Sequence, residues 1–428
     1  MTTTPTASPT INRFVTQLPP TVSVEQQGEV CCVQPQTIEA LQAVLTLLAQ
    51  PEFTTIQVVQ TASDAQELDA SQRLWIDTTI ATATIYTHKP QDFVVTIGTG
   101  KTLEAVESLL QSTNQTLAFT PAYGNQSAMK VGQALAENTL PLEANIRRSS
   151  LNELVLGCAG FSPTTAESVA FGGEVVKNVT GYDVQKFLVG HQYALGVVSS
   201  VTLRTTPLLP VRGVCTHLFE TESTLWACVQ QCLAKPSLWM TQLWVKPKPS
   251  GWLLTIGVAT PNTDLLTTWQ ATYFPESSFL SEGIGAETLS SKESERPQLV
   301  LEIALPLGKT GWQACLHTLI PLLSPDDWQL LPACGVLQVV YHQTTPSISA
   351  LETLATAVSS LGGAFRVIDA DTPLNALKLA IHRLQWAGMP EALQRQQVQL
   401  KQQLDPNAQF YSPFYAQESL SLREGSLV

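Results

Sequence analysis

Charged residues are scarce in this chain. Only 14% of its 428 residues are Asp, Glu, Lys or Arg, and 23 basic against 35 acidic side chains leave a formal charge of −12. About a quarter of the residues in an ordinary soluble domain are charged. A surface that binds nucleic acid must be cationic to meet the phosphates, so this balance argues against nucleic acid as a partner. The 44% of apolar residues excludes a mostly disordered chain.

Long apolar runs are also missing. Runs such as Leu41–Ala49 are too short to cross a bilayer, which takes about 20 residues. The opening MTTTPTASPT has neither the basic start nor the apolar centre of a secretory signal. We therefore expect a cytoplasmic protein with no transmembrane segment. Residues 1–20 are expected to form a flexible N-terminus.

Metal-binding cysteine patterns are absent as well. The eight cysteines include no Cys-x-x-Cys pair, and their closest metal-like spacing is Cys228 and Cys232. These two lie i, i+4 in a predicted helix, Thr224 to Ala234, without a histidine pair nearby. Buried free thiols are the better interpretation. We predict no metal site, and therefore no iron–sulfur cluster held by this chain.

Strands and helices alternate in the first half of the chain, which indicates an α/β arrangement. A proline after one predicted strand opens the first helix, and Thr102 is a plausible N-cap of the second. The predicted strands are Val30–Val33, Ile56–Val59 and Phe93–Ile97, and the predicted helices are Thr37–Ala49 and Leu103–Leu110.

The segment from Ser168 to Pro210 has a denser pattern. Ser168–Lys177 reads as a hairpin closed by Gly172 and Gly173. A short helix, Tyr182–Val189, follows, with Gly190 at the position after its C-cap. Leu195–Leu203 alternates like a strand, and Pro207 and Pro210 mark a domain boundary.

From Val211 onward the order strand, helix, strand repeats loosely. This favours an antiparallel sheet with helices on one face. A polar stretch, Ser277 to Arg296, reads as an exposed loop, and a last helix covers Met389 to Leu404. The other predicted helices are Thr224–Ala234, Thr263–Thr272, Gly311–Leu323 and Ile348–Leu361, and the strands are Met240–Val245, Trp252–Val258, Gln298–Leu305, Gly335–Tyr341 and Ala364–Ile368.

One long ordered block carries a family resemblance. It reads GGEVVKNVTGYDVQKFLVG from Gly172 and continues HQYALGVVSSVTLR to Arg204. This resembles the flavoprotein subunits of glycolate oxidase, within the wider PCMH-type (vanillyl-alcohol-oxidase-like) FAD-binding oxidoreductases. Weaker matches to the same family are Phe93–Gly100, Thr120-Pro121, Ser149–Gly157 and Leu404–Phe410.

The resemblance implies an α+β protein in several parts. A PCMH-type FAD-binding domain of two α/β subdomains would cover 21–210. A ferredoxin-like α+β cap, or substrate domain, would cover 211–387, and a C-terminal helix and tail, 388–428, would return to the FAD domain. The loop that carries a covalent flavin in some relatives has no histidine here, so FAD is expected to bind non-covalently.

The resemblance also implies cofactor contacts. Glycine turns let backbone N–H groups approach a phosphate or a flavin edge without a Cβ clash. Lys177 would supply a cation, and Tyr182 could stack or hydrogen-bond. His382 lies in a predicted helix, where a lone histidine is usually a surface or core residue, so no catalytic base is assigned. The residues carried over as FAD contacts are Pro121, Gly157, Gly172, Gly173, Lys177, Asn178, Tyr182, Asp183, Gly190, Gly196, Val197 and Val198.

The function implied is that of an FAD-binding subunit in a glycolate oxidase-like 2-hydroxy-acid dehydrogenase. The substrate hydride would pass to the flavin. Electrons would leave through an iron–sulfur subunit, in a complex with a larger flavoprotein subunit. Such partners could also hold the chain peripherally at a membrane.

One departure from the family supports an alternative. Where the family has a glycine-rich phosphate loop, this chain has Gln60–Asp69, with no glycine and the carboxylates of Asp64, Glu67 and Asp69. Carboxylates repel a diphosphate. The second glycine pair is also reduced, in MKVGQA from Met129. The alternative is a non-catalytic, FAD-less structural subunit that supports a catalytic flavoprotein paralogue. A binding module unrelated to flavins would leave the Gly172–Gly196 block unexplained.

Overall fold

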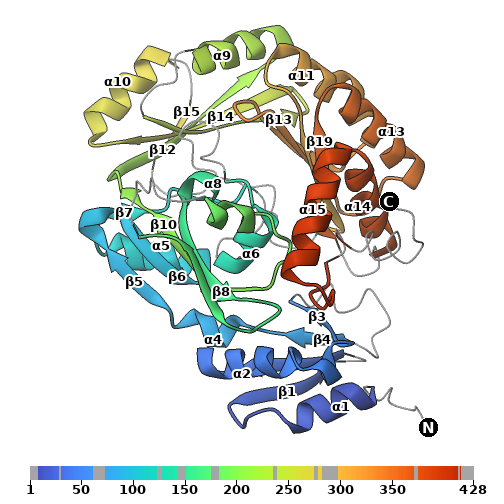
Figure 1. Ribbon diagram of the computed structural model, residues 1–428. Coiled ribbons are helices and arrows are strands. Elements are labelled where there is room, and N and C mark those ends of the chain that lie inside the picture. The colour runs from blue at the N-terminus through green and yellow to red at the C-terminus, as the bar shows by residue number, and fades with distance from the viewer. Residues whose placement is uncertain are drawn as a thin grey trace, which may run out of the picture.

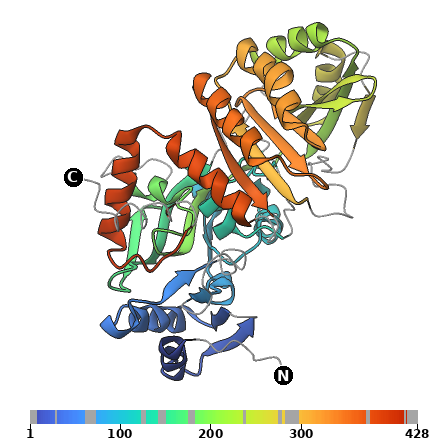
Figure 2. The ribbon, with the colours of Figure 1, turned by 90° about the vertical axis from the view of Figure 1, so that its right-hand side faces the viewer.

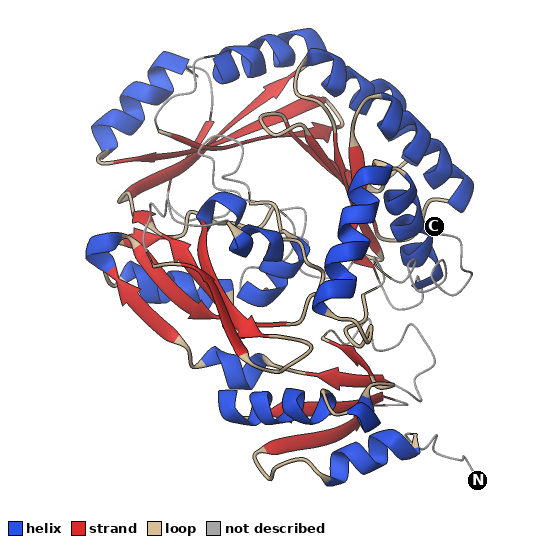
Figure 3. Cartoon of the chain, viewed as in Figure 1, coloured by secondary structure: helices blue, strands red, loops and turns tan. Residues whose placement is uncertain are grey.

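The computed structural model describes residues 8–27, 30–60, 73–122, 128–141, 151–174, 183–234, 239–273, 278–281, 297–370, 375–412 and 415. Two small sheets lie below a large curved sheet, and helices cover the outer face of that large sheet (Figures 1 and 3). The mixture of helices and antiparallel and parallel sheets confirms the predicted α+β class.

The first subdomain is a four-stranded sheet in the order β1-β2-β4-β3. Strands β2, β4 and β3 are parallel, and β1 pairs antiparallel with β2. Helix α2 begins at Thr37, whose hydroxyl accepts a hydrogen bond from the Ala40 N–H, and its buried face packs into the subdomain core. The elements are β1 (Val22–Gln27), β2 (Val30–Pro35), α2 (Ile38–Leu48), η1 (Pro51–Phe53), β3 (Gln57–Val59) and β4 (Arg73–Ile76).

The N-terminus differs from the prediction. Helix α1 (Pro9–Thr16) occupies most of the described part of the stretch expected to be flexible. Ser8 caps it, and Pro9 sits at the first helical position, which its fixed φ favours. Ile11 and Phe14 are buried, and the Phe14 ring meets Phe53 edge-on at 5.2 Å. Two apolar residues three apart are enough to anchor one short helix, and the Thr- and Pro-rich start concealed them.

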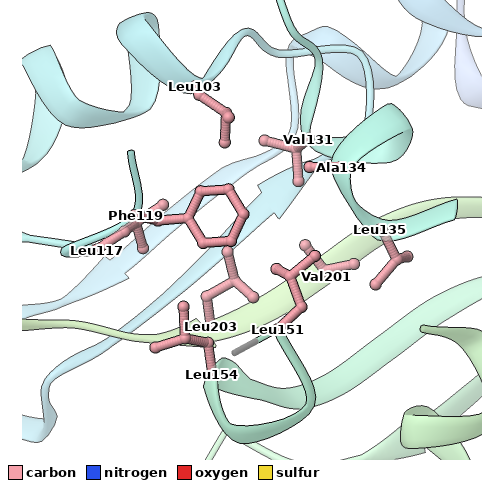
Figure 4. Close-up of a pocket in the computed structure, with 10 residues that line it drawn as sticks. All are labelled: Leu103, Leu117, Phe119, Val131, Ala134, Leu135, Leu151, Leu154, Val201 and Leu203. Atoms are coloured by element: carbon pink, nitrogen blue, oxygen red, sulfur yellow. The ribbon is translucent and has the colours of Figure 1, made fainter. Parts of the chain in front are cut away.

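The second subdomain is an antiparallel five-stranded sheet in the order β5-β6-β10-β8-β9. Thr102 caps helix α5 as predicted. A small apolar cavity lies between the helices and the sheet, lined by ten aliphatic and aromatic side chains (Figure 4). The elements are α4 (Thr79–Ala83), β5 (Tyr86–Lys89), η3 (Pro90–Asp92), β6 (Val94–Gly98), α5 (Leu103–Gln111), β7 (Gln115–Thr116), α6 (Val131–Glu137), α8 (Leu151–Leu154), β8 (Val155–Phe161), β9 (Ser168–Gly172), η4 (Val184–Leu188), β10 (Val197–Arg204) and β11 (Thr206–Pro207).

Strand β9 pairs with the preceding strand, β8, and Gly172 lies opposite Gly157. The predicted hairpin instead placed Gly172 and Gly173 in a turn leading to the next strand. The described residues show β9 ending at Gly172, and residues 175–182, which include the rest of that prediction, lie outside the described part of the chain. The predicted short helix is present as η4, with Gly190 just beyond its end at φ +81°.

The cap is one antiparallel eight-stranded sheet, in the order β15-β12-β14-β13-β17-β18-β16-β19. It contains two β-α-β-β-α-β units, which meet where β13 pairs with β17. Helices cover its outer face in Figures 1 and 2, as the sequence predicted. The elements are β12 (Val211–Phe219), α9 (Glu222–Ala234), β13 (Met240–Lys248), β14 (Gly251–Thr260), α10 (Thr263–Tyr273), β15 (Ser278–Ser281), β16 (Leu299–Ala304), α11 (Lys309–Ala314), η5 (Cys315–Leu319), α12 (Ile320–Leu323), β17 (Asp327–Leu331), β18 (Val336–Tyr341), α13 (Ile348–Ser360) and β19 (Ala364–Ala370).

The chain then comes back to the first subdomain. Helices α14 (Asn375–Ala387) and α15 (Glu391–Leu404) lead to a short extended segment. There Phe410 bridges to Val58 in parallel register, and the Val58 N–H donates to the Gln409 carbonyl. Residues 409–411 therefore cover the outer edge of β3, so that edge is not left open.

Candidate functional site

The Gly190–Gly196 turn joins η4 to β10 and holds an unusual backbone. Gly190 and Gly196 have φ of +81° and +110°, and Gln192 and Tyr193 also lie in the left-handed region at +46° and +62°. Each non-glycine residue there costs about 1–2 kcal/mol. A turn with two such residues in succession persists only where its surroundings fix it.

Helix α6 supplies the first of these anchors. The Gly190 N–H donates to the Leu135 carbonyl at 2.8 Å, and the Gln192 N–H donates to the Ala136 carbonyl at 3.0 Å. Both carbonyls lie in the last turn of α6, where helix carbonyls lack partners within the helix. The turn and the helix end therefore satisfy each other's backbone groups.

Two side chains from distant segments hold the other side of the turn. The Gln60 amide donates to the carbonyls of Tyr193 and Gly196, at 3.1 and 3.0 Å. The Lys401 ammonium donates to the Ala194 carbonyl at 2.7 Å. Gln60 ends the described part of the segment where the family has its phosphate loop. The Gly190–Gly196 turn is therefore where both subdomains and the C-terminal segment meet.

Lys401 is itself buried. Its ammonium pairs with Asp405 at 2.6 Å and also donates to the Phe410 carbonyl. The Asp405 carboxylate in turn accepts from the N–H groups of Gln409 and Phe410. Such a pair offsets the cost of burial only with several hydrogen bonds of this kind. It fixes the C-terminal segment behind the turn.

The glycines of β8 and β9 face the protein's own backbone. A Cβ on Gly172, which has φ +74°, would lie 2.2 Å from the Leu156 carbonyl oxygen. One on Gly157 would lie 3.1 Å from the Phe171 carbonyl oxygen. The Gly173 N–H donates to the Leu156 carbonyl as well. Close packing of two backbones therefore requires glycine at Gly172 and leaves little room for a side chain at Gly157.

The valines after the turn are placed differently from each other. Val197 is buried in the core of the first subdomain. Val198 is half-buried, and its carbonyl accepts a hydrogen bond from the Thr99 hydroxyl at 2.9 Å. Both follow the Gly190–Gly196 turn directly, at the start of β10.

Pro121 lies away from this turn, at the contact with the cap. It is buried and bridges to Pro141, and the carbonyl of the next residue, Ala122, accepts from Gln329 of the cap at 2.9 Å. Trp244, Leu331 and Val336 of the cap pack around Ala122. Pro121 therefore marks where the second subdomain and the cap meet.

Asp183 is exposed and forms an ion pair with Lys186 at 3.0 Å. The hydrogen bond from Lys186 lowers the pKa of the Asp183 carboxyl. Three further predicted contacts, Lys177, Asn178 and Tyr182, lie outside the described residues.

Two buried polar atoms lack a partner within the described chain: Nδ1 of His191, in the turn, and Oε1 of Gln185, in η4, whose amide nitrogen donates to Asp183 at 3.1 Å. Both residues are only 4% exposed. Burial lowers the pKa of His191 to about 4, so its imidazole is neutral at pH 7. An unpaired buried polar atom costs about 1–3 kcal/mol. A flavin carries N–H and C=O groups along its ring edge, which are the kinds of group with which these two atoms could form hydrogen bonds.

Thiol and metal chemistry finds little support. Within the described ranges, no group of three or more His, Cys, Asp or Glu side chains is placed to hold a metal ion. Burial raises the pKa of the Cys158 thiol to about 12, which keeps it protonated and unreactive. Over the same ranges, no helix has both the length and the apolar character to span a bilayer.

Sequence reasoning missed the residues that hold the turn in place. Lys401 and Asp405 could have been noticed from their i, i+4 spacing on a predicted helix. Gln60 carries no such local signal, because the carbonyls that it bonds lie 133 and 136 residues away.

Known proteins resemble the chain in sequence over a limited stretch. No family model matches it. It is 30% identical over 126 residues to glycolate oxidase subunit GlcE of Escherichia coli (strain K12), which covers 29% of this chain and 34% of that protein. It is 28% identical over 132 residues to D-2-hydroxyglutarate dehydrogenase of Xanthomonas citri pv. viticola, covering 30% and 27%. The matches thus span about a third or less of these curated relatives.

The likeness in structure extends over nearly the whole chain. Two crystal forms of alkyldihydroxyacetonephosphate synthase superpose with TM-scores of 0.66 and 0.67, at 13% and 12% identity. They cover 95% and 96% of this chain, and the chain covers 86% and 87% of them. At so low an identity the likeness concerns the fold.

Proposed function

We propose, from relatives and a fold that point to the PCMH-type FAD-binding oxidoreductases, that this chain is a non-covalent FAD-binding oxidoreductase subunit. The more specific proposal is a subunit of a glycolate oxidase-like 2-hydroxy-acid dehydrogenase. One of the curated relatives is named for glycolate oxidase and the other for a 2-hydroxy-acid substrate.

The observation that carries the proposal is the unpartnered, buried Nδ1 of His191 within the Gly190–Gly196 turn. The neutral His191 imidazole and the Gln185 amide would meet polar groups of the cofactor. Backbone groups of the turn would line it, held by Gln60 from the first subdomain. Bound FAD would supply the hydride acceptor. The residues of this chain would bind it, orient it and exclude water beneath the cap.

The partners follow from the same proposal. A flavin that accepts a hydride must pass its electrons on, and the described part of the chain offers no cluster of metal ligands for that. We therefore propose an iron–sulfur subunit as electron acceptor and a larger flavoprotein subunit as neighbour. A cytoplasmic location, with peripheral membrane contact through such partners, remains a prediction.

The test is flavin content and uptake. Purified full-length chain should show flavin absorbance and release FAD on acid treatment, and the apoprotein should quench the fluorescence of added FAD to saturation. His191→Leu and Gln185→Leu should weaken uptake, whereas His317→Leu, at an exposed histidine of the cap, should not. A folded, colourless protein that takes up no FAD would refute the proposal.

A second candidate is the FAD-less structural subunit. The acidic, glycine-free Gln60–Asp69 stretch favours it, and so does the finding that Gly157 and Gly172 serve backbone packing. Isolation of the tagged chain from its native host distinguishes the two. A stoichiometric complex whose flavin resides wholly in a related subunit supports the structural role, and flavin bound to this chain excludes it.

A further inference from the structure

The end of helix α6 links the cap to the Gly190–Gly196 turn. Its last carbonyls need donors from outside the helix. Gly190 and Gln192 of the turn donate to those of Leu135 and Ala136. The next two carbonyls, of Glu137 and Asn138, accept from Arg366, which belongs to strand β19 of the cap. The helix end is thus shared between the turn and the cap.

The Arg366 guanidinium is held for this contact. Its Nη1 donates to the Glu137 carbonyl at 2.5 Å, and its Nη2 donates to the Asn138 carbonyl at 2.9 Å. Nε and Nη2 also meet the Glu302 carboxylate at 2.9 and 2.7 Å. The two side chains are 21% and 9% exposed. The planar fork of arginine makes all of these bonds at once, which a single ammonium cannot do.

A row of polar side chains extends this contact across four strands. Glu302 lies directly opposite Arg366 on one side and Gln338 on the other, and Gln338 lies opposite Gln329. Gln338 donates to Glu302 at 3.2 Å and accepts from Gln329 at 2.7 Å. Gln329 reaches back to the Ala122 carbonyl of the FAD-type domain. The row therefore contacts that domain at both ends.

We propose that Arg366 is a positioning residue for the cofactor-binding turn. Gln192 and Tyr193 are non-glycine residues with left-handed φ, so the turn is strained and should change conformation once an anchor is lost. Arg366 fixes the end of α6, and α6 fixes the turn. The cap thereby fixes the conformation of the Gly190–Gly196 turn indirectly, because Arg366 bonds to α6 and not to the turn. The step from the turn to FAD rests on the proposed function.

The experiment measures amide hydrogen exchange and FAD affinity on the full-length chain. In Arg366→Met, which loses both bonds to the end of α6, amides of residues 190–196 should exchange about tenfold faster, the factor that corresponds to about 1.4 kcal/mol, and the FAD dissociation constant should rise by a similar factor. The amides of β2 and β4 should keep wild-type rates. Arg366→Lys, which keeps a cation, should lie between the two. Arg395→Met, at a 64% exposed arginine paired with Glu391, should match wild type.

The outcomes separate the two proposals. Wild-type exchange rates at 190–196 in both Arg366 variants would overturn the positioning role, whatever the affinity for FAD. If the Arg366 variants exchange faster than wild type at 190–196 and the wild-type chain binds no FAD, the coupling is supported and the proposed function is refuted. If Arg366→Met fails to fold, the lysine variant decides by the same comparison. Uniformly faster exchange throughout the cap and both subdomains of the lysine variant would show a general structural role and overturn the proposal.

Discussion

Replacement of Gly172 by alanine tests whether the glycines of the family motif serve the fold. Gly172 and Gly190 have nearly equal φ, +74° and +81°. Their surroundings differ, since a Cβ on Gly172 would lie 2.2 Å from a backbone oxygen of Leu156. A Cβ on Gly190 would meet only the Cβ of Asn138, at 3.4 Å. Gly190→Ala is therefore a matched control in the same subdomain.

The magnitudes follow from these two terms. Both variants bear the left-handed strain of alanine, about 1–2 kcal/mol. Both also lose unfolded-state entropy to the same extent, which cancels in the comparison. Only Gly172→Ala must push strands β8 and β9 apart, and overpacking of this kind costs about 1–3 kcal/mol more. We expect it to be the less stable variant by that difference.

The assay is amide hydrogen exchange of β8 and β10 in apoprotein, with the thermal midpoint as a second readout. Strand β8 pairs with both β9 and β10, so opening at Gly172 should raise its exchange first. Without FAD, the result cannot depend on cofactor contacts. Equal destabilisation by the two substitutions would refute the packing argument, and an unchanged apoprotein in both would assign the glycines to the cofactor.

Three further predictions concern one residue of the turn and two of the side chains that anchor it. Because the pKa of His191 is about 4 in the folded chain against an ordinary 6.5, protonation favours the unfolded state. The contribution of His191 to the free energy of unfolding should be intact above pH 6.5 and fall by about 3 kcal/mol as the pH drops to 4. The urea midpoint, measured against pH, should lose this part of its decline in His191→Leu and keep it in His317→Leu. Lys401→Met should cost about 3–5 kcal/mol, since it leaves Asp405 buried and unpaired, and the variant Lys401→Met, Asp405→Asn should recover part of this in thermal midpoint; no recovery would contradict the argument. Gln60→Ala should speed exchange at residues 193–197, whereas rates equal to wild type would remove Gln60 as an anchor.

Much of the fold could be predicted because its signals are local. The caps at Thr37 and Thr102 and the apolar faces that follow specify α2 and α5 within a few residues. Strand β17 escaped prediction because its sequence, DWQLL, places a glutamine at a fully buried position. Gln329 is tolerated there only because it hydrogen-bonds to Gln338 and to the Ala122 carbonyl. No local sequence pattern predicts a hydrogen bond to a residue 207 positions away.

The candidate site was predictable in part for the same reason. Gly190 has a positive φ, as its predicted place after the helix C-cap implied, and Gly172 and Gly196 have one as well. Arg366 and Glu302 could not be found, because the carbonyls that Arg366 meets belong to a segment more than 200 residues away. A charged residue in an amphipathic strand or helix reads as a solvated one until its partners are known.

The two classes of residue in the motif bear differently on function. Gly172 is required by the backbone contact between β8 and β9, and Gly157 has little room for a side chain, so both would persist even in a descendant that had given up FAD. The two glycines therefore indicate the fold and not the cofactor. Nδ1 of His191 and Oε1 of Gln185 have no hydrogen-bond partner in the described chain, so their replacement by leucine takes no hydrogen bond of these two atoms from a structural subunit. Weaker FAD uptake in those variants would therefore argue for a bound cofactor more strongly than the glycines do.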